Sequence, residues 1–211
     1  MKTDELIDLL ANDKAPEWPL QLAFAVAAAA GTLVAAALFF AAIGFRPDIA
    51  VAVQSIRFLF KFVVTLSLAA TATAVALRIG RPGDDVRSAS AKLLVAPILL
   101  LCAVGLELVA VPSREWTTVL VGHNSRFCLT LIPLLSIGPL VCFLAALRRG
   151  APSNPGRAGA VAGLAASGIA ATFYAANCND DSPLFVATWY PISILMVSTA
   201  GYLIGRRVLR W

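Results

Sequence analysis

The most reactive side chains in this chain are its four cysteines, and two of them lie next to polar segments. Cys128 follows the polar run 122–127, and Cys178 lies within the polar run 177–183. A thiol in such a setting can join a disulfide, act in a redox pair or bind a soft metal ion. Cys102 and Cys142 fall inside apolar stretches, where cysteine behaves as a small packing residue.

Three kinds of chemistry are open to Cys128 and Cys178: a structural disulfide, a redox pair or soft-metal site, and unpaired thiols. A metal site would draw on His123, the only histidine of the chain, and on Asp180 or Asp181 as further ligands for zinc or copper. No Cys-x-x-Cys spacing supports a metal directly. The sequence therefore predicts no resident cofactor, with a transient soft metal ion such as copper or zinc as the alternative.

The elements that position these thiols must suit a very apolar chain. Of 211 residues, 59% are hydrophobic and 14% are charged, whereas a soluble domain is roughly 45–50% apolar and about 25% charged. This balance argues against a water-soluble enzyme and against intrinsic disorder. The net charge of +5 does not indicate nucleic-acid binding, because most basic residues flank apolar segments, where they act as topology signals. We therefore expect a membrane protein.

Six apolar stretches are long enough to cross a bilayer, which takes about 20 residues. They are 20–44, 55–77, 91–111, 127–147, 158–176 and 185–205. The fifth is the least hydrophobic, because it consists mostly of alanine and glycine. The predicted fold is all-α, a polytopic membrane bundle of six transmembrane helices, in which residues 20–211 form the sensor domain.

An even number of crossings places both termini on one side, and the basic residues indicate which side. Twelve of the 17 fall on the terminal side and five on the other. Cytoplasmic loops carry the excess of Lys and Arg. The sequence therefore predicts a multi-pass membrane protein with both termini in the cytoplasm, in contact with the lipid bilayer.

Residues 1–19 form a separate cytoplasmic segment with an acidic character. The short helix predicted there carries a leucine stripe at helical spacing, and its apolar and acidic members are Asp4, Glu5, Leu6, Ile7, Asp8, Leu9 and Leu10. A helix of about ten residues is marginal in water, so it is either a solvated leader, a segment folded back on the cytoplasmic loops, or a motif that docks in a partner's groove. Acidic residues disfavour an anionic membrane surface, which favours a protein partner.

Ionisable residues also occur at membrane depth. Glu107 lies one turn inside the outer end of the third span, and Arg57 and Lys61 lie at a similar depth in the second. We expect Glu107 to pair with Lys61 or Arg57 and to lock the two helices together. Small residues at helical spacing in the last two spans predict close helix packing there; they are Gly159, Gly163, Ser167, Gly201 and Gly205.

The chain resembles the NrsF-type (negative regulator of sigma F) anti-sigma factors. The resemblance rests on the start 1–11, on six spans, on the run 131–136 that follows Cys128, and on the run 178–185 that leads to Trp189 and Tyr190. It implies a six-span inner-membrane protein that sequesters an extracytoplasmic-function sigma factor and releases it under heavy-metal or oxidative stress. Asn177 departs from the pattern, because a histidine is expected before the second cysteine, and this argues against a preformed metal site.

By the same resemblance, the sensor cysteines correspond to Cys128 and Cys178, and the sigma-binding role falls to the segment around Leu6, Leu9 and Leu10. Because a segment of 19 residues is short for sole inhibition, the loop 78–92 or the loop 148–157 is expected to add contacts with the partner. The protein is not expected to be an enzyme or to bind nucleic acid directly. Two other functions are alternatives: a thiol-dependent membrane oxidoreductase, disfavoured by the lack of a Cys-x-x-Cys, and a small transporter, disfavoured by the scarcity of buried charge.

Overall fold

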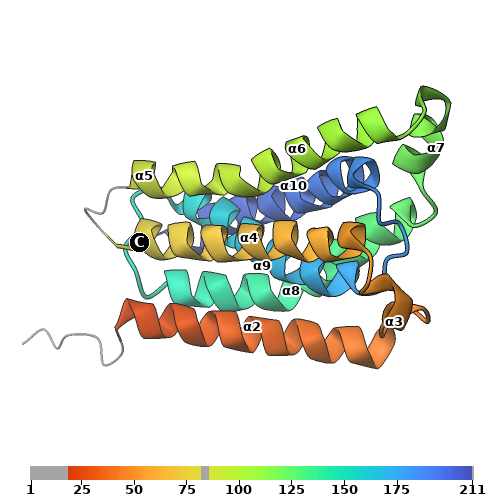
Figure 1. Ribbon diagram of the computed structural model, residues 1–211. Coiled ribbons are helices and arrows are strands. Elements are labelled where there is room, and N and C mark those ends of the chain that lie inside the picture. Colours follow the sequence, from red (N-terminus) through yellow and green to blue (C-terminus); the bar gives the residue numbers. More distant parts are fainter. Residues whose placement is uncertain (1–18, 82–85, 211) are drawn as a thin grey trace, which may run out of the picture.

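The structure, a computed structural model, describes residues 19–81 and 86–210, and every regular element within them is a helix. Six of its helical segments are long and apolar enough to cross a membrane (Figure 1). The predicted all-α fold with six helices of spanning length is confirmed. The segments are α2 (Leu20–Ala42), α4 (Ile56–Ile79), the stretch Ser88–Ala110 that ends in α6 (Val95–Ala110), α8 (Ser125–Leu147), α9 (Pro155–Ala175) and α10 (Pro183–Val208).

Short helices occupy the connections, and several spans differ in length from the prediction. The connecting helices are α3 (Ile49–Ala52), α5 (Val86–Ala91) and α7 (Trp116–Val121). The last span was predicted at 185–205 but begins at Pro183, because the hydroxyl of Ser182 caps it by accepting the N–H of Leu184. Asn154 caps α9 in the same way through the N–H of Arg157. Polar caps thus extend these helices beyond their apolar residues.

The bundle has two distinct ends. At one end, which we call the terminal end, the start of α2 lies against the end of α4, and the start of α9 lies against the end of α10. At the opposite end, which we call the cysteine end, α3 and α7 lie in the connections (Figure 1). Cys128 and Cys178 both lie at the cysteine end, as the count of spans predicted.

Helix α9 is the centre of the bundle and packs on α10, α4 and α8. Of its spanning window 72% is buried, against 17% for the window of Ser88–Ala110. This placement explains why the fifth span is the least hydrophobic, since its side chains face other helices rather than the surroundings. Alanine and glycine also allow neighbouring helices to approach closely.

The closest approach joins α9 to α10. A Cβ added at Gly159 would collide with the carbonyl oxygen of Gly201, and a Cβ at Gly201 would collide with the carbonyl oxygen of Gly159. One turn along, a Cβ at Gly163 would lie 2.7 Å from the Cα of Ser198. The expected close packing of these small residues is therefore present.

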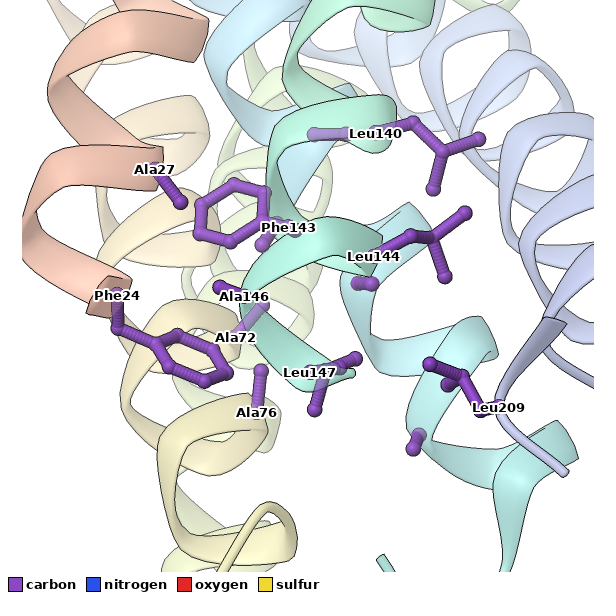
Figure 2. Packing of buried hydrophobic residues seen from close by; sticks show 14 of the residues in the cluster. Phe24, Ala27, Ala72, Ala76, Leu140, Phe143, Leu144, Ala146, Leu147 and Leu209 are labelled. Atoms are coloured by element: carbon purple, nitrogen blue, oxygen red, sulfur yellow. The ribbon is translucent and has the colours of Figure 1, made fainter. Parts of the chain in front are cut away.

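Two apolar clusters fill the bundle, one towards each end. At the terminal end, Phe24 of α2 lies 6.3 Å from Phe143 of α8 between ring centroids, and Ala72 and Ala76 of α4 belong to the same cluster (Figure 2). The second cluster, at the cysteine end, contains both Cys128 and Cys178. The predicted sensor thiols are therefore part of the packed interior.

Candidate functional site

Cys128 and Cys178 come from different elements but meet in the same buried cluster. Cys128 lies in the first turn of α8, and Cys178 lies in the connection after α9; their exposures are 0% and 1%. All four cysteines have free thiols. The Sγ of Cys128 lies 3.8 Å from the hydroxyl of Ser193 on α10. The structure thus brings the two predicted sensor residues together, but beneath the surface.

The environment of Cys178 keeps its thiol protonated. Burial raises the pKa of this thiol above its ordinary value, and the positive charge of Lys61 nearby offsets only part of that rise. The thiolate is the form that attacks electrophiles and binds metal ions. Burial and the raised pKa therefore both disfavour the reactive thiolate of Cys178 in this arrangement.

The expected accessory metal ligands do not converge on the thiols. The side chain of His123 is 93% exposed, and its Nδ1 lies 3.6 Å from Oδ1 of Asp180. Asp181 is paired with cationic residues instead. Within residues 19–81 and 86–210, no three His, Cys, Asp or Glu side chains are close enough together to hold a metal ion.

Asp180 holds the start of α8. Its Oδ2 accepts the N–H groups of His123 (3.0 Å) and Asn124 (2.8 Å) and the side-chain amide of Asn124 (3.0 Å). Just before them the chain turns at Gly122, whose φ of 57° favours glycine. A Cβ there would also overlap the side chains of Phe185 and Asp180. The position of the helix that carries Cys128 is therefore set by a residue two positions after Cys178.

Two buried cations hold the segment around Cys178 itself. The carbonyl oxygen of Cys178 accepts hydrogen bonds from Nζ of Lys61 (2.8 Å) and Nη1 of Arg46 (3.3 Å). The same two cations pair with Asp181, at 2.6 Å for Lys61 and 2.9 Å for Arg46. Lys61 is only 1% exposed. A hydrogen bond from Arg46 also lowers the pKa of Asp48, and the pair fixes the connection after α2.

Glu107 takes one of the two partners expected for it. Its Oε2 lies 3.1 Å from Nη2 of Arg57, whereas Lys61 turns to Asp181. The hydroxyl of Ser182 donates to Oε1 of Glu107 at 3.1 Å. The segment 177–182, which we call the hub loop, is therefore bonded to α4, to the connection after α2, to α6 and to the start of α8.

Sequence reasoning missed Arg46, Asn124 and Tyr174 as members of this site. The hydroxyl of Tyr174 donates to the carbonyl oxygen of Asn124 at 3.2 Å and so links α9 to the start of α8. A signal was nonetheless present, since Arg46 is one of the few basic residues expected outside the terminal side, where topology does not call for it.

Comparison with known proteins agrees with this architecture. The sequence profile of the family described as "NrsF: Negative regulator of sigma F" matches residues 10–211. The chain belongs to the NrsF family. It is 33% identical over 218 residues to the "Anti-sigma-F factor NrsF" of Caulobacter vibrioides (strain NA1000 / CB15N), and the match covers 100% of each chain. It is 30% identical over 217 residues to the "Probable anti-sigma-F factor NrsF" of Azospira oryzae (strain ATCC BAA-33 / DSM 13638 / PS), again over 100% of each chain.

No solved structure matches the chain. The expected partner-binding residues 4–10 lie outside the described residues. Their role, and the division into segments 1–19 and 20–211, stay predictions. The hub loop overlaps the run 178–185, which is one of the segments on which the resemblance to NrsF rests.

Proposed function

We propose that this chain is a membrane-embedded anti-sigma factor. It sequesters an extracytoplasmic-function sigma factor and releases it when a heavy metal or an oxidant acts on Cys128 and Cys178. Two relatives named as anti-sigma-F factors support the regulatory role. Six helices of spanning length support a multi-pass protein of the inner membrane.

The charge distribution supports a cytoplasmic location for the terminal end. Among the described residues, the carboxylates are Asp48, Glu107, Glu115, Asp180 and Asp181, and their contacts place them towards the cysteine end. The basic residues at the terminal end are Arg78, Arg81, Lys92, Arg148, Arg149, Arg157, Arg206, Arg207 and Arg210. An excess of Lys and Arg is typical of cytoplasmic loops. The cysteine end would then face the periplasm, where disulfides form.

The observation that carries the proposal is the bond from Lys61 to the carbonyl oxygen of Cys178, at 2.8 Å. Lys61 belongs to α4, and α4 extends from the cysteine end to Gly80 at the terminal end. A change in the backbone at Cys178 must therefore break or move a buried contact of a helix that reaches the other side. This geometry provides a direct route from the thiols to the side on which the partner would bind.

The chemical step alters the thiols after the hub loop opens. In oxidation, the two thiols lose two protons and two electrons to the oxidant as a sulfur–sulfur bond forms. In metal capture, a soft cation replaces the two thiol protons. Either product differs in shape from two packed thiols, so the closed hub loop cannot reform unchanged.

Reporter induction in cells tests the sensor role. Cys128→Ser and Cys178→Ser should keep the sigma-dependent reporter silent but abolish its induction by cadmium or by an oxidant. Cys102→Ser and Cys142→Ser are the matched controls, because neither thiol lies in the site, and both should respond as the unchanged protein does. Full induction in the Cys128→Ser/Cys178→Ser double variant would refute the sensor assignment.

Co-purification tests the docking role of the N-terminal segment. Leu6→Asp with Leu9→Asp should abolish recovery of the sigma factor with the membrane protein and leave the reporter constitutively active. Asp13→Asn, in the same segment but outside the predicted docking residues, should retain binding. If the double variant still co-purifies with the sigma factor and keeps it silent, docking by this segment is wrong even if the cysteine variants behave as expected.

A further inference from the structure

A second polar site lies at the terminal end, opposite the cysteines. A pocket of about 310 Å³ opens between the start of α9 and the end of α10. Its lining residues include Ser153, Asn154, Gly156, Tyr202, Arg206 and Arg210. Pockets elsewhere in the described bundle, such as the one of about 580 Å³ between α8 and α10, have mainly apolar linings. This one stands apart because hydrogen-bond donors surround it.

The pocket is rich in positive charge that the described chain does not neutralise. Neither Arg206 nor Arg210 forms an ion pair with a carboxylate of the described residues. The guanidinium of Arg206 instead lies 5.7 Å from the ring centroid of Tyr202. The planar guanidinium groups of these two arginines can each donate a pair of hydrogen bonds to an oxyanion.

The remaining walls add further hydrogen-bond donors. The side-chain oxygen Oδ1 of Asn154 already accepts the N–H of Arg157. The side-chain NH2 group of Asn154 therefore remains to donate to a ligand. The first N–H groups of a helix have no acceptor within it, and Gly156 is in the first turn of α9. Gly156 also forms the floor, since a Cβ there would lie 2.6 Å from the Tyr202 ring and 2.9 Å from Cγ of Arg206.

We propose that this pocket binds a phosphate oxyanion, supplied by the headgroup of an anionic phospholipid. A tetrahedral phosphate offers several acceptors to converging donors. The pocket lies in the last turns of a helix of spanning length, beside an exposed tyrosine, which is where headgroups meet such helices. Basic pockets between spanning helices on the cytoplasmic side are typical lipid-headgroup sites. The lipid source rests on the membrane placement proposed above but not on the cysteine chemistry.

Thermal stability of the purified full-length protein in detergent tests the site. Short-chain phosphatidylglycerol, short-chain phosphatidylcholine and inorganic phosphate are each titrated, and the midpoint of unfolding gives an apparent affinity. Phosphatidylglycerol should stabilise the protein saturably and more strongly than phosphatidylcholine. In Arg206→Gln/Arg210→Gln its affinity should fall roughly 10- to 100-fold, the loss expected for charge-assisted hydrogen bonds.

The control is Arg157→Gln/Arg207→Gln, which removes the same charge from neighbouring residues that do not line the pocket. Its affinity should stay within about twofold of that of the unchanged protein. Equal losses in the two double variants, or no saturable effect of phosphatidylglycerol, would overturn the site. Equal stabilisation by inorganic phosphate would keep the oxyanion site and overturn the lipid as its source. Membrane fractionation of each variant tests the membrane placement separately.

Discussion

Replacement of Lys61 by methionine is the sharpest test of the closed hub loop. Methionine retains the length of the buried side chain but removes the bond to the carbonyl oxygen of Cys178 and the 2.6 Å pair with Asp181. Loss of one partner of a buried ion pair costs about 3–5 kcal/mol. Asp181 is 20% exposed and keeps Arg46, so we expect a smaller loss of about 2 kcal/mol, near the value of one charged hydrogen bond.

A loss of about 2 kcal/mol raises the population of the open loop about 30-fold. The assay is the rate of maleimide labelling of Cys178 in a protein whose other three cysteines are serine, at reagent concentrations where the loop closes faster than it is labelled. The rate should rise about 30-fold in Lys61→Met, in proportion to the open population. Arg78→Met, an exposed residue at the terminal end of the same helix, should change the rate less than about threefold.

The opposite result would refute the reasoning, because the two routes to labelling have opposite signs. If Cys178 reacts within the closed structure, removal of the Lys61 charge raises the pKa of the thiol further and slows labelling. Acceleration therefore indicates opening, and an unchanged or slower rate shows that Lys61 does not hold the loop closed. Labelling of the unfolded protein at the same pH provides the upper limit of the rate.

Three further outcomes are expected. Gly159→Ala should lower the free energy of unfolding of the detergent-solubilised protein by about 1–3 kcal/mol, because the added Cβ collides with α10. Gly105→Ala, whose Cβ would enter open space, should be neutral or stabilising. Equal effects of the two substitutions would contradict the close approach of α9 and α10. Asp180→Ala should lower the unfolding temperature by several degrees, since three donors lose their acceptor, while the exposed His123→Ala should not; circular dichroism on heating measures both. The rate of labelling of Cys178 should increase with pH, with its midpoint above the pKa of an unfolded cysteine, because burial raises the pKa of the folded thiol. A midpoint below the pKa of an unfolded cysteine would contradict the closed environment.

The helices could be predicted because each span is a long apolar run bounded by charge or by proline. The central place of α9 could not, although its alanine and glycine content indicated close packing. The pairing of Arg57 with Glu107 was one of two arrangements that the spacing allowed. What decided it was Asp181, far along the chain, which pairs with Lys61. Long-range pairing of this kind depends on which helices are neighbours, and periodicity contains no such information.

The burial of the cysteines also could not be predicted from their setting. Polar residues surround both thiols in the sequence, and this suggested reactive groups at the surface. In the structure those polar residues bond to one another around the thiols and close them in, as Asp180 does with Asn124. The same residue types that mark a loop in the sequence therefore form the cover of a buried site.

The central position of α9 has a consequence for synthesis of the protein. Helices α4 and α8 both pack on α9, yet α9 starts only at Pro155. At about 5–20 residues per second, residues 1–19 leave the ribosome about 7–27 s before the helix around which the bundle assembles. A chain that stops in that interval carries the expected partner-binding segment without a sensor. Under the proposed function, complete synthesis is therefore a condition for regulated release, and degradation of truncated chains would protect the sigma factor from a repressor that cannot respond.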